Sequence, residues 1–99
     1  RRAEFQQRRD YLLPALRALG FDIAVEPQGA FYLYADISAF SKDAQAFCTH
    51  FLETEHVAFT PGIDFGFHRA NQHVRIAYTQ SLPRLEQAVE RIARGLRHI

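Results

Sequence analysis

Arg75 is the residue whose type and neighbours best suit anion binding in this sequence. It lies in residues 73–78 (His-Val-Arg-Ile-Ala-Tyr), a run that predicts a β-strand. Alternation along that strand places the valine, isoleucine and tyrosine on one face and Arg75, with Ala77, on the other. A guanidinium is planar, always charged and fork-shaped, so it suits a carboxylate held by two parallel hydrogen bonds. A solvated arginine, or one in an internal ion pair, is the more common explanation of such a position.

Two glycine-containing segments could place backbone or aromatic groups beside a ligand. Residues 61–66 (Pro-Gly-Ile-Asp-Phe-Gly) contain glycines that would let the backbone approach a bound molecule closely. An ordinary turn explains them too, and the segment lacks both the Gly-x-Gly-x-x-Gly pattern and the following lysine of a phosphate-binding loop. Residues 27–29 (Pro-Gln-Gly) predict a turn that leads Phe31 and Tyr32 onto a strand. One ring could join the core while the other lines a cleft, although hairpin packing alone accounts for both.

Other chemistries find little support in the sequence. The histidines show no spacing typical of metal ligands, so we predict no metal site and expect these side chains to be exposed. They are His50, His56, His68, His73 and His98. Cys48 falls on the apolar face of a predicted helix and is expected in the core. No serine lies in a nucleophile-elbow motif, and the predicted strands carry no RNA-binding motif.

Length and composition indicate one small domain. The chain has 99 residues, and its net charge of +1 creates no field that would attract nucleic acid or an anionic membrane. A single cysteine rules out an internal disulfide and is compatible with a reducing compartment. No apolar run approaches membrane-spanning length. The sequence begins without Met in an already helical pattern, so we expect a piece of a longer protein that is not a complete enzyme.

The first part of the chain predicts a helix followed by a hairpin. Residues 3–19 repeat apolar residues at helical spacing, and Gly20 follows where a left-handed C-cap is expected. Pro14 cannot donate a hydrogen bond to the carbonyl of Asp10, so we predict a kink or a break in this helix. Strands are predicted at residues 21–25 and 30–36 and are expected to pair with each other.

The rest of the chain predicts two helices and two strands. Ser41 is expected to cap a helix that ends near residue 54 or 55, and a short strand is predicted at residues 57–60. A loop over residues 63–72 precedes the last strand, and Ser81 is expected to cap a helix at residues 82–97. This order predicts an α+β domain of two layers, in which about three helices pack on a small, largely antiparallel sheet.

Four motifs follow one another along the chain. Arg-Arg-Asp-Tyr-Leu at residues 8–12 leads to Leu-Gly-Phe at residues 19–21, and Pro-x-Gly-Ala-Phe-Tyr follows at residues 27–32. Val-Ala-x-Thr-Pro-Gly-x-x-Phe-Gly occupies residues 57–66, and His-Val-Arg-Ile-Ala-Tyr occupies residues 73–78. Together they cover essentially the whole chain, which resembles the C-terminal part of class I/II pyridoxal-phosphate-dependent aminotransferases of the aspartate-aminotransferase fold (fold type I).

The resemblance implies roles for individual residues. Residues 1–99 would form the C-terminal small domain of such an enzyme, and the large, cofactor-binding domain would be absent. Arg75 would bind the α-carboxylate of the substrate, and Phe31 would line the substrate side of the domain. The cleft between the domains would be faced by a loop that contains Pro61, Gly62, Phe65 and Gly66.

The resemblance also implies what this chain lacks. No catalytic residue is expected in it, and pyridoxal phosphate would be bound by the absent large domain. Lys42 is the only lysine, and its position after Ser41 does not match the family's cofactor-binding lysine. Residues 67–72 depart from many relatives in containing no glycine.

By resemblance, the full-length protein would transfer an amino group between an amino acid and a 2-oxo acid, as a cytoplasmic homodimer without nucleic-acid or membrane partners. The isolated chain would be inactive. Three alternatives stay open on the sequence alone. They are the same domain in a related pyridoxal-phosphate lyase or decarboxylase, a free-standing α+β module that binds a ligand, and a structural domain without a ligand.

Overall fold

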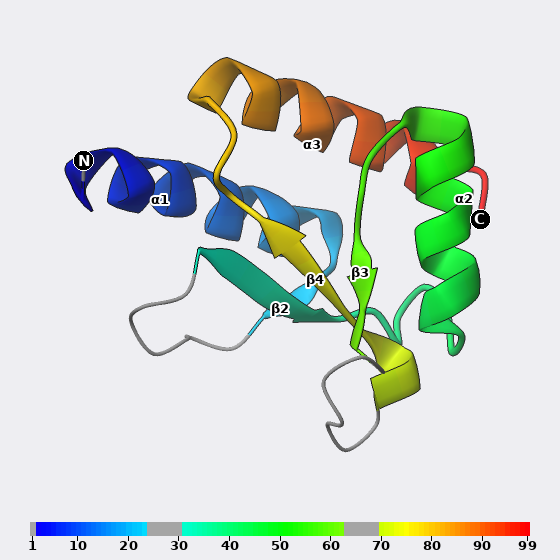
Figure 1. The fold of residues 1–99 in the computed structure, drawn as a ribbon. Helices are drawn as coiled ribbons and strands as arrows, with labels where there is room; N and C mark the ends of the chain where they lie inside the picture. The colour runs from blue at the N-terminus through cyan, green and yellow to red at the C-terminus, as the bar shows by residue number, and fades with distance from the viewer. Residues whose placement is uncertain (1, 24–30, 63–69) are drawn as a thin grey trace.

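The computed structural model describes residues 2–23, 31–62 and 70–99 (Figure 1). Its helices are α1 (Arg2–Leu19), α2 (Ala44–Glu55), the 3-10 helix η2 (Ala70–Gln72) and α3 (Leu82–Leu96). Its strands are β1 (Asp22–Ile23), β2 (Tyr32–Asp36), β3 (Thr60–Pro61) and β4 (His73–Ala77).

The strands form an antiparallel sheet in the order β1-β2-β4-β3. Helices α1 and α3 lie side by side over one face of this sheet, and α2 stands at the β3 edge, where it also contacts α3 (Figure 1). Within the described ranges, the α+β architecture of three α-helices on a small antiparallel sheet is therefore confirmed. The predicted pairing of the first two strands is confirmed as well, because β1 and β2 are antiparallel neighbours.

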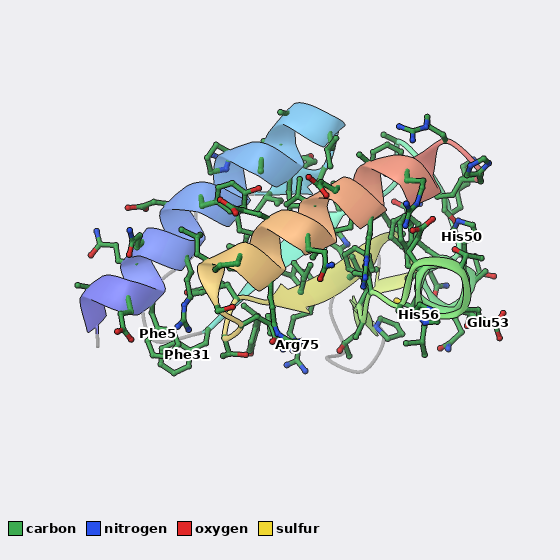
Figure 2. The ribbon with its side chains drawn as sticks, turned by 90° about the horizontal axis from the view of Figure 1, so that it is seen from above. Phe5, Phe31, His50, Glu53, His56 and Arg75 are labelled. Atoms are coloured by element: carbon green, nitrogen blue, oxygen red, sulfur yellow. The ribbon has the colours of Figure 1, made fainter. Side chains whose placement is uncertain are left out.

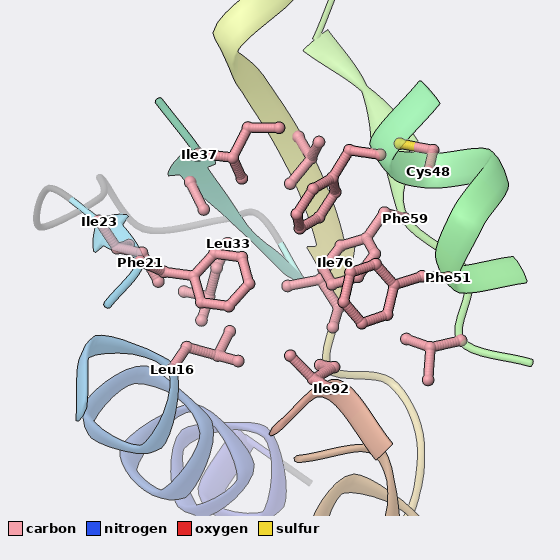
Figure 3. Close-up of a cluster of buried hydrophobic side chains, with 14 of the residues drawn as sticks. Leu16, Phe21, Ile23, Leu33, Ile37, Cys48, Phe51, Phe59, Ile76 and Ile92 are labelled. Carbon is pink, nitrogen blue, oxygen red and sulfur yellow. The ribbon is translucent and has the colours of Figure 1, made fainter. Parts of the chain in front are cut away.

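The core lies between the sheet and the helices. Leu33 and Ala35 of β2 and Val74 and Ile76 of β4 alternate with more exposed residues, and all four are buried. This period of two is what places one face of a strand against the core. The helices meet that face with a set of fully or almost fully buried side chains (Figure 3). The set consists of Leu12 and Leu16 of α1 and Leu85 and Ile92 of α3.

Helix α2 is attached to the domain through phenylalanine rings. The ring of Phe59, which precedes β3, lies 5.4 Å from that of Phe47 and 5.3 Å from that of Phe51, measured between centroids. Cys48 of the same helix is buried, as predicted. Gly95 of α3 packs so closely on Phe51 that a Cβ atom there would overlap the ring. The absence of a side chain at Gly95 thus lets α2 and α3 approach each other.

The predicted break in the first helix is wrong. Helix α1 is continuous from Arg2 to Leu19 with Pro14 inside it. Pro14 is exposed, while Leu12 and Leu16 on either side of it are fully buried. Because those two residues belong to the core, their packing holds the helical path although one backbone donor is missing.

The end of α1 follows the sequence prediction. Gly20 has a φ of 113°, and its N–H donates to the carbonyl of Arg17 at 3.0 Å. The N–H of Phe21 donates to the carbonyl of Leu16 at 3.1 Å. These two bonds form a Schellman motif, in which glycine supplies the positive φ without steric cost.

Several predicted boundaries change. Asp43, not Ser41, is the N-cap of α2, because its Oδ1 atom accepts a hydrogen bond from the N–H of Ala46 at 3.1 Å. Ser41 instead accepts from the N–H of Asp43, so both residues organise the same turn. Ser81 is the N-cap of α3 as predicted, but its side chain makes no capping hydrogen bond.

The predicted strands are shortened. Of residues 57–60, only Thr60 pairs with a neighbouring strand, and Pro61 joins it in β3. The predicted turn at residues 27–29 and part of the two strands beside it lie outside the described residues.

Candidate functional site

Arg75 lies on the sheet face that is turned away from α1 and α3, which we call the outer sheet face. Its neighbours in register are Tyr34 of β2 and Thr60 of β3. Alternation puts Tyr32 of β2 and His73 of β4 on the same face as Arg75. Val74 and Ile76 of β4 point into the core on the other face. The sequence prediction for the two faces of this strand is thus confirmed.

The guanidinium of Arg75 lies over the ring of Tyr32. The distance from Cζ to the ring centroid is 4.3 Å, within the range of a cation–π interaction. Arg75 itself is half-buried, and Tyr32 is 37% exposed, so the pair sits at the boundary between the sheet and solvent. This arrangement places a fork-shaped cation at an accessible position on the central part of the sheet.

A second group of side chains supports the outer sheet face beside Arg75. The rings of Tyr34 and His73 are stacked, with centroids 4.8 Å apart and planes inclined by 8°. Asp36 lies at the far end of this group, with its Oδ2 atom 3.9 Å from Nε2 of His73. Burial raises the pKa of the Tyr34 hydroxyl above its ordinary value. The stack joins β2 to β4 next to the candidate anion site.

Gly62, predicted as part of a cleft loop, packs against the same stack. A Cβ atom at Gly62 would lie 2.5 Å from the Tyr34 hydroxyl and 2.9 Å from the carbonyl oxygen of His73. Its lack of a side chain therefore serves contact within the domain. Pro61 belongs to β3 and pairs with Val74. Phe65 and Gly66, the other predicted members of the loop, lie outside the described residues.

Phe31 lies immediately before β2, next to Tyr32. Its ring stacks on that of Phe5 in α1, with centroids 4.5 Å apart, and 47% of the residue is exposed (Figure 2). The guanidinium of Arg8 lies over Phe5, 5.3 Å from the ring centroid. The backbone carbonyl of Phe31 accepts a hydrogen bond from the N–H of Tyr78 at 2.9 Å.

Tyr32, which contacts Arg75, was not among the site residues predicted from the sequence. The sequence did predict that two adjacent rings would separate to the two faces of the strand, but it singled out Phe31. The missing information was the register between β2 and β4. Because Tyr34 is paired with Arg75, Tyr32 is the diagonal neighbour of Arg75. Alternation alone would have placed Tyr32 and Tyr34 on one face, and this signal was present in the sequence.

The expected exposure of the histidines is wrong for two of them. His50 and His73 are half-buried, whereas His56 and His98 are exposed, and His68 lies outside the described residues. Nε2 of His50 donates to the carbonyl of Gly95 at 3.1 Å, and His73 takes part in the stack described above. Among the described residues, no group of three potential ligands could hold a metal ion.

Comparison with known proteins identifies the family. Residues 1–92 match the family model for aminotransferase class I and II, and this chain belongs to that family. It is 40% identical to the valine–pyruvate aminotransferase of Mycobacterium tuberculosis over 95% of its length, and 43% identical to the aspartate/prephenate aminotransferase of Thermus thermophilus over 96%.

Solved structures agree with these relatives. A crystal structure of an aminotransferase from Mycobacterium tuberculosis matches 98% of this chain with a TM-score of 0.90 and 39% identity. An aromatic aminotransferase from Pyrococcus horikoshii matches 98% with a TM-score of 0.87 and 34% identity. The chain covers 24% and 23% of the two relatives named by sequence, and 25% of each of these two structures. It therefore spans about a quarter of such proteins.

The family generally works with pyridoxal phosphate, and the side chains of this chain do not fit the covalent binding of that cofactor. Lys42 is its only lysine. It is exposed in the segment that enters α2, next to the N-cap Asp43, and it is not part of the outer sheet face.

No helix in the described part of the chain is both long and apolar enough to cross a membrane.

Proposed function

We propose that this chain is the C-terminal small domain of a pyridoxal-phosphate-dependent aminotransferase and that Arg75 binds the α-carboxylate of its substrates. The observation that supports this best is the position of Arg75, half-buried on the outer sheet face with its guanidinium over Tyr32. The full-length protein would transfer an amino group between an amino acid and a 2-oxo acid. It would act as a cytoplasmic homodimer, and the cofactor would be bound by the part outside this chain.

The proposed role of Arg75 is to bind and orient. Two parallel hydrogen bonds from a guanidinium fix both the place and the plane of a carboxylate. Each hydrogen bond to a charged group is worth roughly 1.5–3 kcal/mol, so the pair can supply much of the affinity for a small substrate. A carboxylate held in this way presents the neighbouring carbon of the substrate in one orientation, which is what a reaction at that carbon needs.

Phe31 and the segment of Pro61, Gly62, Phe65 and Gly66 would border the same substrate space. The exposure of the Phe31 ring, 47%, is compatible with such a border. Movement of the small domain over the substrate would bring these residues and Arg75 towards the rest of the protein and exclude water.

The test is an Arg75→Ala variant of the full-length protein, assayed with several amino acids. All share the carboxylate, so kcat/KM is expected to fall by a similar factor for each, corresponding to about 2–5 kcal/mol. An amine without a carboxylate serves as the matched substrate and is expected to be much less affected. Arg75→Lys is expected to restore little, since a point charge cannot donate two parallel hydrogen bonds. Unchanged kcat/KM for the amino acids in Arg75→Ala would exclude the proposed role.

A further inference from the structure

We propose that Tyr32 is a positioning residue, which holds the guanidinium of Arg75 in the orientation that receives the substrate carboxylate. This inference rests on the function proposed for Arg75. The inference adds Tyr32, whose ring contacts the guanidinium of Arg75 and which was absent from the predicted site.

The contact between the two side chains is fixed by the register of the central strands. Tyr34 is paired with Arg75 and Tyr32 with Ala77, so Tyr32 is the diagonal neighbour of Arg75 across β2 and β4. Diagonal neighbours on one sheet face are within reach when one is aromatic and the other is long. Cζ of Arg75 lies 4.3 Å from the centroid of the Tyr32 ring, well inside the limit of about 6 Å for a cation–π interaction.

The backbone of Tyr32 is held by its own strand pairing with Ala77 and by its neighbours on both sides. Leu33, the next residue, is 1% exposed and belongs to the core. Phe31, the preceding residue, accepts a hydrogen bond from the N–H of Tyr78 and stacks on Phe5. These contacts fix the place at which the Tyr32 side chain leaves the sheet, on the face that carries Arg75.

A ring has one advantage over an acidic residue as the support of this arginine. An arginine side chain has several rotatable bonds, and restricting them before the substrate arrives lowers the entropy lost on binding. A carboxylate partner would restrict them too, but it would accept the same hydrogen bonds as the substrate carboxylate and compete with it. The ring of Tyr32 attracts the cation without being a strong hydrogen-bond acceptor.

The test uses Tyr32→Leu and Tyr32→Phe in the full-length protein. Leucine keeps an apolar side chain but has no ring, and phenylalanine keeps the ring without the hydroxyl. Tyr32→Leu is expected to lower kcat/KM for amino acids by about 2- to 30-fold, the range that a cation–π contact would produce. Tyr32→Phe is expected to behave as the parent protein, and an amine without a carboxylate is expected to be used equally well by all three.

A double-mutant cycle separates positioning from a general structural role. In an Arg75→Ala background, Tyr32→Leu is expected to cause no further loss, because the residue acts through the arginine. Equal losses in both backgrounds, or no loss in either, would overturn the inference while leaving the role of Arg75 intact. If Arg75→Ala itself has no effect on amino acids, the function proposed for Arg75 fails first, so the two failures are distinguishable.

Discussion

Two arginines of this domain, Arg75 on β4 and Arg94 on α3, have opposite kinds of partner. Arg94 donates from Nε and from a terminal nitrogen to Oε1 of Glu55 in α2, at 2.9 and 2.7 Å. The Glu55 side chain is 6% exposed and that of Arg94 is 56% exposed, so the pair closes the junction between two helices. Arg75 lies over the Tyr32 ring on the outer sheet face. An aromatic ring attracts a cation without accepting charge-assisted hydrogen bonds, whereas a carboxylate accepts them.

Under the proposed function, the group that each arginine contacts, more than the residue type, separates the structural Arg94 from the binding Arg75. The charge of Arg94 offsets the free energy that it costs to bury the carboxylate of Glu55. Its hydrogen bond to Glu55 holds the pKa of that carboxyl below its ordinary value. In the function proposed above, Arg75 uses its charge to bind the carboxylate of a substrate. The predictions below test this contrast, in the order of their expected size.

The largest loss of fold stability is expected from Glu55→Gln in the 99-residue chain. Removing the buried charge leaves Arg94 without its hydrogen-bonded carboxylate and weakens the α2–α3 junction. Glu53→Gln, an exposed position on the same helix, is the matched control and is expected to change little. The measurement is the midpoint of urea denaturation, and equal midpoints for the two variants would contradict a structural role for Glu55.

The same pair predicts how stability depends on pH. Because the pKa of Glu55 is lower in the folded chain, its contribution is fully present above the unfolded pKa and is lost as the pH falls through the folded pKa. The parent chain is therefore expected to lose more stability than Glu55→Gln between about pH 5 and pH 3, a window set by the ordinary glutamate pKa. Parallel pH profiles for the two proteins would speak against the depressed pKa.

Gly62→Ala is expected to destabilise the chain by about 1–3 kcal/mol through overpacking. The added Cβ atom would lie 2.5 Å from the Tyr34 hydroxyl, so the outer sheet face would have to adjust. Tyr34→Phe removes the atom that clashes, and in that background Gly62→Ala is expected to cost less. Equal costs in both backgrounds, measured by urea denaturation, would show that the contact with the hydroxyl is not the cause.

His56→Gly is expected to stabilise the chain by about 1 kcal/mol or less. His56 ends α2 with a φ of 57°, a left-handed conformation that costs a residue with a Cβ roughly 1–2 kcal/mol and is easily adopted by glycine. Part of this gain is offset because glycine loses more conformational entropy on folding. A lower midpoint of denaturation for His56→Gly would indicate that the histidine side chain makes a stabilising contact.

The smallest change in stability is expected from Arg75→Ala, about 0.5–1 kcal/mol, the size of a partly exposed cation–π contact. This is the counterpart of the Glu55 experiment, since a binding arginine can be removed from the fold at little cost. A loss as large as that of Glu55→Gln, measured under the same conditions, would indicate that Arg75 is a structural residue of the domain.

The sequence predicted the element types well because period and capping are local signals. The strand of Arg75 and the last helix follow from alternation and helical spacing alone. Ser41 was confused with Asp43 because both residue types cap helices and both belong to one turn. A kink or a break was predicted at Pro14 from a local rule, and the helix is continuous there because tertiary packing holds its path. These errors arise where long-range contacts decide between two local solutions.

The candidate site was predicted less completely. Arg75 was proposed because its residue type and strand position are visible in the sequence and the resemblance to the family implies its role, and that role stays a prediction. Tyr32 was not assigned, because its contact depends on the register between β2 and β4, which are separated by α2 and β3 along the chain. The close contacts of Gly62 with Tyr34 and His73 were not predicted either, because they depend on the position of β3 beside β4.

The most direct test of the contrast between the two arginines is the binding of an unreactive monocarboxylic acid to the full-length protein, measured as competitive inhibition. Arg75→Ala is expected to raise the inhibition constant about 30- to 4,000-fold, which corresponds to a loss of about 2–5 kcal/mol. Arg94→Lys, which keeps a cation beside Glu55, is expected to leave it unchanged. An inhibition constant that stays the same in Arg75→Ala would contradict the assignment of Arg75 as the carboxylate-binding residue.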